Sequence, residues 1–254
     1  MNWKFARARH ALLFVPLALL STGVSASLVT FTLDPSRSSL TLEPTSTRSF
    51  AAAAIDGQGG AGLRTSYSGT LSADVTAGHI TLLGASLTAA DSGNWSPGTG
   101  PANYGFNVAV SGLSAQVALR DLKATGSSGA MALSGGAFDA TGVQWALTDG
   151  TASGDMQYSG ATGSGMATPT ADLTGLNAFN GAGGGTLAPD GTLTLPVDWA
   201  LGTLLNGVPV IASLQGSLVA TSSVATSAVP VPGAMLLMAT GLIGLGATVG
   251  RRRR

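Results

Sequence analysis

Few side chains in this sequence could carry out nucleophilic or acid–base chemistry. It contains no cysteine, so it offers no thiolate nucleophile and no cysteine-based metal site. Of its two histidines, His10 lies in an amino-terminal segment that we expect to be removed, which leaves His79 as the sole imidazole. One imidazole cannot build a histidine-rich zinc site, and no Gly-x-Ser-x-Gly elbow supplies a serine nucleophile. We interpret His79, between Gly78 and Ile80, as a surface residue at a strand edge.

Carboxylates are the remaining source of catalytic chemistry, because a pair of them can hydrolyse a glycosidic bond and a cluster can bind calcium. Most of the twelve acidic residues occur in turn-like contexts, such as Asp56-Gly57, Asp149-Gly150 and Asp190-Gly191, in which aspartate caps the backbone. No calcium-loop motif is present. We therefore expect no catalytic residue, no metal and no cofactor, and a carboxylate-based hydrolase ranks third among the functions considered.

Three tryptophans beyond the first ten residues could stack on sugar rings. Trp145 and Trp199 lie within apolar, strand-like stretches, so we expect both in the core. Trp95 lies in a polar segment rich in proline and glycine, where functional side chains are often found. Trp95 is therefore the residue that we expect to contact a ligand.

The elements that would position these side chains are predicted to be β-strands. Between Ser27 and about residue 220 the apolar residues recur mainly with period 2, which is typical of strands with one buried face. Pro189-Asp190-Gly191 separates two such runs and predicts a hairpin. We predict one all-β domain at residues 27–221, an antiparallel β-sandwich or flattened barrel. Strands are expected at residues 28–33, 38–42, 66–75, 79–89, 107–110, 115–122, 142–147, 185–187, 192–195, 197–201 and 208–220.

Two stretches lack the alternation and are predicted to be long loops. One is residues 91–104, which includes Trp95, and the other is the Gly-, Ser- and Thr-rich stretch 153–185. Long loops in a compact domain are often functional, so a bound partner is expected there first.

The amino-terminal 26 residues have the composition of a secretory signal peptide. Lys4, Arg7 and Arg9 precede an apolar run at residues 11–20, and small residues before Ser27 form a cleavage site. We expect cleavage between Ala26 and Ser27, so that the mature chain is exported and begins at Ser27.

Charge is strongly segregated along the chain. Three of the twelve basic residues lie in the first ten positions and four are the last four residues, so five remain in between, against all twelve acidic residues. The middle of the chain thus has a net charge of −7. An acidic domain is unsuited to tracking phosphates, which excludes nucleic acid as a partner.

The carboxyl-terminal segment, residues 229–254, combines three features in a fixed order after a linker at residues 222–228. They are a motif, an apolar run of 17 residues at 233–249, and an arginine cluster. The motif is Val229, Pro230, Val231 and Pro232, and the cluster is Arg251, Arg252, Arg253 and Arg254. The run is at the low end of what spans a bilayer core of ~30 Å, and the positive-inside rule keeps the arginines cytoplasmic. We expect a single transmembrane helix with the β domain outside.

This order of features resembles the PEP-CTERM sorting signal of Gram-negative bacteria, whose usual pattern is Val-Pro-Glu-Pro, an apolar helix with a Gly-Leu-x-Gly-Leu-like core, and an arginine cluster. Residues 240–246, Thr-Gly-Leu-Ile-Gly-Leu-Gly, match that core, whereas Val231 stands in place of the glutamate. The resemblance is confined to residues 229–254. It implies recognition by an exosortase, removal of the tail, and attachment or release at the surface, usually in bacteria that make exopolysaccharide.

The sequence therefore predicts an exported, noncatalytic protein of the cell surface or extracellular matrix, anchored transiently in the inner membrane. Its expected partners are signal peptidase, an exosortase-like processing enzyme and exopolysaccharide. The alternative is a β module that binds a glycan or a lipid, in its interior or under the loop that carries Trp95.

Overall fold

The computed structural model describes residues 27–222 apart from 45–48, 57–61, 96–99, 111, 161–162 and 206–207. The predicted signal peptide, sorting motif, transmembrane helix and arginine cluster lie outside the described residues, as does the predicted linker apart from Ser222, which ends β16. No helix within the described part of the chain is long and apolar enough to cross a membrane.

The prediction of an all-β domain is confirmed. The described residues form a 16-stranded sheet and one short 3-10 turn, η1 (Ala140–Gly142). The strands are β1 (Ser27–Leu33), β2 (Ser39–Pro44), β3 (Ser49–Ala52), β4 (Arg64–Val75), β5 (His79–Ala89), β6 (Tyr104–Val110), β7 (Leu113–Ser128), β8 (Ala130–Ala132), β9 (Ala137–Phe138), β10 (Val143–Gly160), β11 (Gly163–Ala167), β12 (Thr170–Asp172), β13 (Asn177–Phe179), β14 (Gly185–Leu187), β15 (Thr192–Leu205) and β16 (Val208–Ser222).

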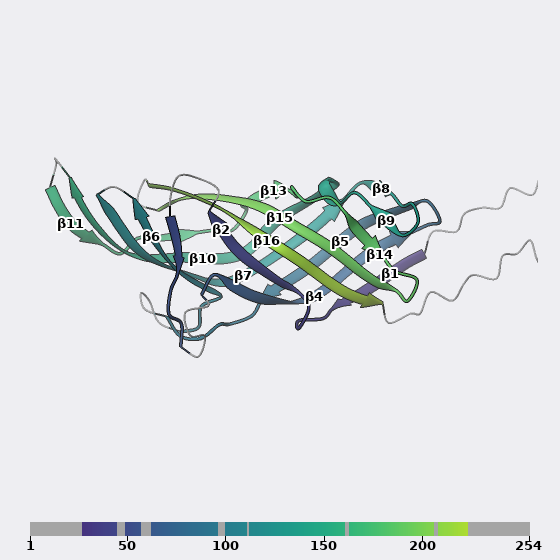
Figure 1. Cartoon of the computed structure of the whole chain (residues 1–254), viewed down its shortest axis with the longest axis horizontal. Helices are drawn as coiled ribbons and strands as arrows, with labels where there is room; N and C mark the ends of the chain where they lie inside the picture. The colour runs from purple at the N-terminus through teal and green to yellow at the C-terminus, as the bar shows by residue number, and fades with distance from the viewer. Residues whose placement is uncertain are drawn as a thin grey trace, which may run out of the picture.

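The strands run obliquely along an elongated domain (Figure 1). Their order is β11-β10-β7-β5-β4-β1-β16-β15-β14-β9, and β6 lies beside β7 with β3 outside it. Short strands share the flank of a long one: β11, β12 and β13 all pair with β10 at successive positions. The described chain begins and ends at the same end of the domain, whereas β6 and β11 lie at the opposite end, which we call the distal end (Figure 1).

The sheet curls so that its two sides meet at Asn180. This residue follows β13, which pairs with β10, and its Nδ2 donates to the carbonyl of Pro196 in β15 at 2.9 Å. Its Oδ1 accepts from the backbone N–H of Asp198 at 2.8 Å, and the N–H of Gly181 donates to the Asp198 carbonyl at 2.7 Å. The curled sheet encloses the apolar faces of its long strands, an arrangement consistent with a sandwich or a barrel.

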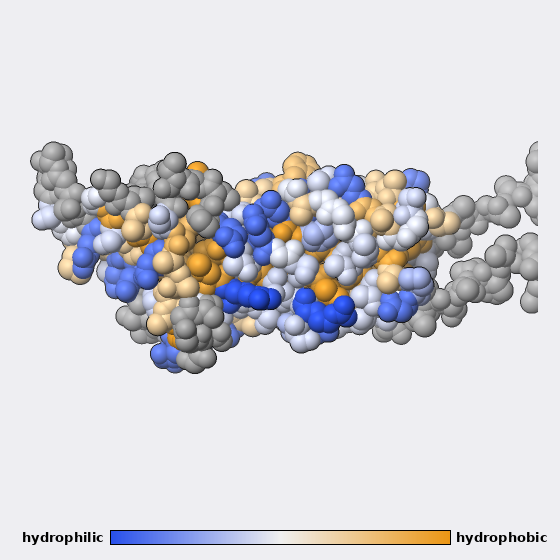
Figure 2. Space-filling view, in the orientation of Figure 1, coloured by the Kyte–Doolittle hydropathy of each residue, from blue (hydrophilic) through white to orange (hydrophobic). Residues whose placement is uncertain are grey.

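Trp145 and Trp199 lie in the core, as predicted. Their side chains are 1% and 3% exposed, and their rings pack at a centroid distance of 6.4 Å across the interior between β10 and β15. Gly126 in β7 makes room for the first of these rings, because a Cβ there would lie 2.4 Å from Trp145 Cζ3. Outside the core, hydrophilic and hydrophobic residues are interspersed on the face seen in Figure 2.

Each predicted strand overlaps a strand of the structure, and β5 and β14 have the predicted bounds. The strands predicted separately at 192–195 and 197–201 are one strand, β15. The loop predicted at 91–104 is confirmed over its described part, in which Asn94 and Pro101 form an isolated bridge. The loop predicted at 153–185 is wrong, because this stretch holds the second part of β10 and all of β11, β12 and β13. Glycine, serine and alanine occupy many positions of this stretch, so the alternation of large apolar with polar residues that marks a strand is absent from its sequence.

A buried pair of tyrosines joins β4 to β6. The Tyr67 and Tyr104 hydroxyls are 3.2 Å apart, and the Tyr104 hydroxyl donates to the Leu40 carbonyl. Burial raises the pKa of Tyr67 to about 12 and the pKa of Tyr104 well above its ordinary value. Both phenols are therefore held in the neutral form by the fold.

We expect the domain to lose stability at alkaline pH because of this pair. A phenol with a raised pKa in the folded state stabilises fully below its unfolded pKa of about 10 and loses that contribution as the pH rises towards 12. The contribution of Tyr67 is about 2–3 kcal/mol. Urea unfolding between pH 8 and 12 should show a steeper loss for the wild type than for Tyr67→Phe. Equal losses of unfolding free energy in the two proteins would show that groups other than Tyr67 cause the loss of stability at alkaline pH.

Candidate functional site

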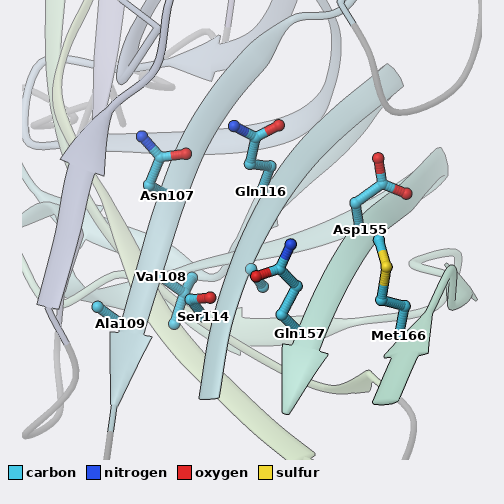
Figure 3. A pocket seen from close by; sticks show the side chains of 9 residues that line it. Asn107, Val108, Ala109, Ser114, Gln116, Asp155, Gln157 and Met166 are labelled. Atoms are coloured by element: carbon cyan, nitrogen blue, oxygen red, sulfur yellow. The ribbon is translucent and has the colours of Figure 1, made fainter. Parts of the chain in front are cut away.

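A hollow of about 460 Å³ lies on the outer face of β6, β7, β10 and β11 at the distal end of the domain. We call it the distal hollow. Its polar side chains are those of Asn107, Gln116, Gln157, Asp155 and Ser114. Figure 3 shows the three amides on neighbouring strands, with Asp155 and Met166 beside them.

The strand register places these side chains in rows across the sheet. Asn107 is directly opposite Gln116, which is directly opposite Asp155 on its other side. In the adjacent row Gln157 lies between Ser114 and Met166. Directly opposite residues have Cβ atoms about 4.5–5.5 Å apart, so the first row is a short ladder of polar groups and the second is a polar pair that ends at Met166.

Alternation along the strands explains why the amides face outward. Phe106, Val108, Val117 and Met156 are buried, and each of them neighbours one of the polar residues in sequence. Since successive side chains point to opposite faces of a strand, burial of this apolar set turns Asn107 and its neighbours outward.

The chemistry of the distal hollow is suited to binding uncharged polar ligands. Each amide supplies both a donor and an acceptor, which is what a sugar bearing adjacent hydroxyls requires. Asp155 is the one ionisable side chain among the residues that line the hollow, so no second acid or base is paired with it. Met166 is 76% exposed and adds an apolar contact at the edge.

Trp95 lies elsewhere, beside the isolated bridge of Asn94 with Pro101 in the loop after β5. Its side chain is partly buried over the backbone of β6, since a Cβ at Gly105 would lie 3.3 Å from Trp95 Cδ2. Its carbonyl accepts from Arg120 Nη2 at 2.8 Å. The structure thus gives Trp95 a packing role in the loop, and its contact with a ligand stays a prediction.

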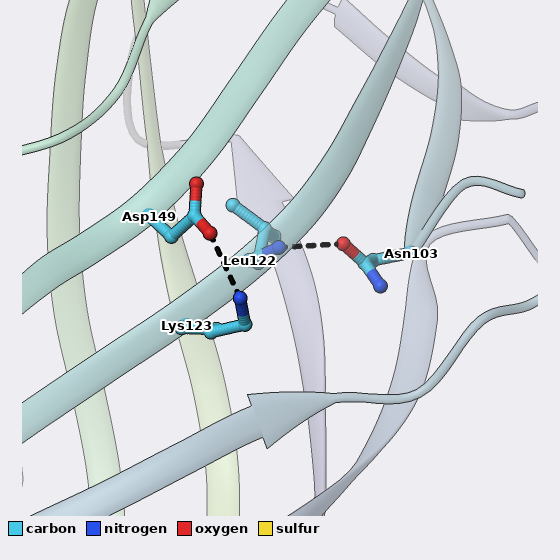
Figure 4. A network of polar contacts seen from close by, with 4 residues as sticks. All are labelled: Asn103, Leu122, Lys123 and Asp149. Carbon is cyan, nitrogen blue, oxygen red and sulfur yellow. Dashed lines mark hydrogen bonds and ion pairs between the residues drawn. The ribbon is translucent and has the colours of Figure 1, made fainter.

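The loop that carries Trp95 is fixed at its far end by Asn103. The Asn103 Oδ1 accepts from the backbone N–H of Leu122 at 2.9 Å, and its Nδ2 donates to the Ala90 carbonyl at 3.1 Å. Figure 4 shows this contact next to the ion pair of Lys123 with Asp149. Asn103 therefore supplies a hydrogen-bond acceptor to the backbone of β7 at the point where the pairing of β7 with β10 is interrupted.

Several carboxylates cap the backbone, as predicted. Asp139, Asp172 and Asp190 each accept a hydrogen bond from the backbone N–H two residues ahead, which lowers the pKa of each carboxyl. The prediction for Asp149-Gly150 is wrong: this pair lies inside β10 at a shift of register. The shift of register between β10 and β7, and not a turn, gives Gly150 a φ of 148°, which residues other than glycine rarely adopt.

Asp149 instead forms an ion pair with Lys123, with 2.9 Å between Nζ and Oδ2. The hydrogen bond from Lys123 is the main cause that lowers the pKa of Asp149. Both side chains are about half exposed, so the pair contributes little to stability. His79 begins β5 and is exposed, as predicted. Within the part of the chain that the structure describes, no three His, Asp or Glu side chains converge as a metal site requires.

An apolar pocket between the strands is small. It holds about 40 Å³ and is lined by residues of β2, β6, β7, β15 and β16, including Leu42, Phe106 and Leu201. Sites for small molecules usually measure about 300–1,000 Å³, so this pocket is too small for a lipid chain.

The signal cleavage residues and the sorting residues are not brought into this site. Ser27 is the first residue of β1 and is exposed, whereas Ala26, the motif at 229–232 and the cluster at 251–254 lie outside the described residues. The sequence reasoning missed the amides of the distal hollow. The alternation at 104–110 could have identified Asn107, but the glycine-rich stretch concealed Asp155 and Gln157.

The fold and the distal hollow define a curled antiparallel β domain with a depression lined by amides on its outer face. Comparison with models of protein families, with curated proteins and with solved structures finds no match.

Proposed function

We propose that this chain is an exported, noncatalytic protein of the cell surface or extracellular matrix that associates with exopolysaccharide through the distal hollow. An exosortase-like enzyme would process its carboxyl-terminal signal. The observation that carries the proposal is the polarity of the domain. The described chain begins and ends at one end, and β6 and β11 lie at the other (Figure 1). These two strands help to line the amide-bearing distal hollow.

This polarity suits a domain that is tethered by its carboxyl terminus. A chain that continues from Ser222 through a short linker into a membrane segment would hold the end opposite the distal end towards the membrane. The 18-residue strand β10 reaches the distal end, and strands of that length extend about 55 Å. The hollow would therefore be presented outward, where a polymer outside the cell can reach it.

Charge favours a neutral glycan as the partner. The chain between its two basic ends carries a net charge of −7, which repels polyanions at low ionic strength. The hollow itself supplies mainly neutral amide and hydroxyl groups.

We also infer that the domain is a flattened barrel and not a pair of separate sheets. Support comes from Asn180 and Gly181, whose hydrogen bonds join the segment paired with β10 to Pro196 and Asp198 in β15.

Processing of the two ends tests the export and sorting part of the proposal. In wild-type cells we expect mature protein that begins at Ser27 and lacks the mass of the tail beyond the motif, whereas an exosortase deletion should retain that mass. Val231→Glu restores the usual motif and should be processed at least as fast as the wild type. Intact-mass measurement of the tagged β domain distinguishes these forms. A tail retained in both strains would identify a permanent anchor.

Binding of neutral polysaccharides tests the glycan part. Affinity electrophoresis in gels that contain dextran, galactomannan, xyloglucan or alginate should retard the protein in at least one neutral gel and leave it unaffected by alginate, which is anionic. The double change Gln116→Ala and Gln157→Ala should abolish most of the retardation, because it removes two amides of the distal hollow. Gln215→Ala, an exposed amide on β16 outside the hollow, is the matched control. Retardation by none of the neutral polymers would overturn glycan binding.

A further inference from the structure

A second hollow, which we call the proximal hollow, lies farther along the same strands, and we propose that the two hollows are the ends of one track for a long neutral polysaccharide chain. This inference rests on the proposed function and deepens it, because it specifies a polymer and not a short oligosaccharide as the ligand.

The proximal hollow measures about 490 Å³ and is lined by residues of β5, β7, β10 and β13. Its polar groups are the Gln144 and Asn177 amides and the hydroxyls of Thr125 and Ser127. Gln144 is directly opposite Phe179, whose ring is 66% exposed. An exposed ring beside an amide and hydroxyls offers a sugar both a stacking surface and hydrogen bonds.

A β-bulge supplies a second apolar side chain to the proximal hollow. Ser72 of β4 pairs with Gly84, but the next residue, Ala73, pairs with Leu82, so Leu83 is the extra residue. Leu83 is 55% exposed and lines the hollow. Bulges commonly redirect a side chain next to a functional site, and here the redirected side chain is a large apolar one in solvent.

Exposed apolar side chains gather at the two hollows. Among the described residues five large hydrophobic side chains are exposed, and three of them, Met166, Leu83 and Phe179, border one hollow or the other. Isolated exposed hydrophobic residues are common on proteins, but their concentration beside two amide-lined depressions is what sugar-binding surfaces need.

Both hollows are built on the outer face of the same pair of strands, β7 and β10. Gln157 of β10 lies in the distal hollow and Gln144 in the proximal one, and the 13 residue steps from one to the other extend about 43 Å along a strand. β11, β12 and β13 flank β10 over this length. The Lys123–Asp149 pair lies between the hollows on the same two strands (Figure 4).

The connecting surface is polar and close to neutral in charge. Asp149 is opposite Lys123 and pairs with it, so these two charges cancel. On β7 the loop that carries Trp95 covers part of this surface, because Arg120 donates to the Trp95 carbonyl and Ala118 is buried.

The surface that connects the hollows is therefore mainly that of β10, with Thr151 exposed and Ser153 half-buried. Such a surface does not select a charged polymer, and it can hydrate or contact a chain that passes from one hollow to the other. A chain long enough to reach both would bind as a bivalent ligand, whose second contact is intramolecular.

Chain length is the variable that tests the track. For the neutral polysaccharide that retards the protein most, we would measure binding of the processed protein by calorimetry with long chains and with tetrasaccharides of the same linkage. Long chains are expected to bind 10²–10⁴-fold more tightly, since linked contacts give gains of this order. Two tetrasaccharides, one in each hollow, should bind per protein molecule.

Two matched variants distinguish the track from the distal hollow alone. Gln144→Ala with Phe179→Ala should reduce long-chain affinity to that of a tetrasaccharide and leave one tetrasaccharide bound, in the distal hollow. Gln215→Ala with Ile211→Ala removes one exposed amide and one exposed apolar side chain from β16 and should change neither quantity.

Each outcome assigns success or failure to one of the two proposals. The track would be overturned if affinity did not depend on chain length, one tetrasaccharide bound per protein molecule, and the Gln144 and Phe179 changes had no effect. Glycan binding at the distal hollow would remain intact in that case. No binding of any neutral chain, long or short, would overturn the proposed function itself.

Discussion

Replacing Asn180 by alanine is expected to destabilise the domain by about 3–5 kcal/mol, because several buried backbone groups lose their partner at once. The Asn180 side chain is 3% exposed. The two protons of its Nδ2 are shared among the carbonyls of Ala140, Ala182 and Pro196, and its Oδ1 accepts from the N–H of Asp198. A buried polar group left unsatisfied costs about 1–3 kcal/mol, and water entering the space of the deleted amide would recover part of the sum.

Urea unfolding of the processed protein measures this effect, and Asn177→Ala provides the matched control three residues earlier. Asn177 is exposed, and its Nδ2 donates to the Gly175 carbonyl alone, so its loss should cost less than about 1 kcal/mol. Similar costs at the two positions would contradict the role given to Asn180 in joining the two sides of the sheet.

Local pattern was sufficient to predict the long strands. From Leu193 to Trp199 every second residue is buried and lies on the inner face, so period 2 in the sequence reports directly on burial. The same reasoning predicted that Trp145 and Trp199 belong to the core. Such predictions succeed where a strand has one apolar and one polar face.

The distal end could not be predicted in this way, because small residues replace the apolar signal. In β10 the buried positions from 152 to 156 are alanine, glycine and methionine, and the partner strand β11 reads Gly-Ser-Gly-Met-Ala. Pairing with β7 keeps β10 extended there, and this information is carried by residues about 40 positions away. The candidate site was partly hidden for the same reason, since two of its five polar side chains, Asp155 and Gln157, lie on this stretch.

Shifts of register were equally inaccessible to a pattern. In β7 the buried positions change from odd to even numbers around Asp121, which has a φ of 56° and is the sole non-glycine with positive φ in the described chain. Leu83 is likewise turned outward by a bulge in β5. Each shift is set by how two strands fit together, so the exposed residues that it creates can be identified in the structure and not in the sequence of one strand.

Adding one methyl group at Gly126 is expected to destabilise the domain by about 2–4 kcal/mol through overpacking against a rigid ring. The new Cβ would lie 2.4 Å from Trp145 Cζ3 and 2.5 Å from Cε3. Neither atom can move without displacing the indole, which is 1% exposed and packs against Trp199. Gly129→Ala, three residues later, is the matched control, because its Cβ would meet nothing within 4 Å.

A double-mutant cycle identifies the clash as the cause. Trp145→Leu alone should cost about 3–5 kcal/mol by leaving a cavity, but combined with Gly126→Ala it should cost at least 1 kcal/mol less than the sum of the two changes, since the added methyl then enters space that the indole vacated. Costs that add without coupling would show that Gly126 is required for another reason, such as the backbone of β7. Gly126 also lines the proximal hollow. Coupling to Trp145 would therefore mean that packing in the core determines the backbone position of β7 at the base of that hollow. In that case Gly126→Ala should weaken long-chain glycan binding together with stability, whereas Gly129→Ala should leave both unchanged.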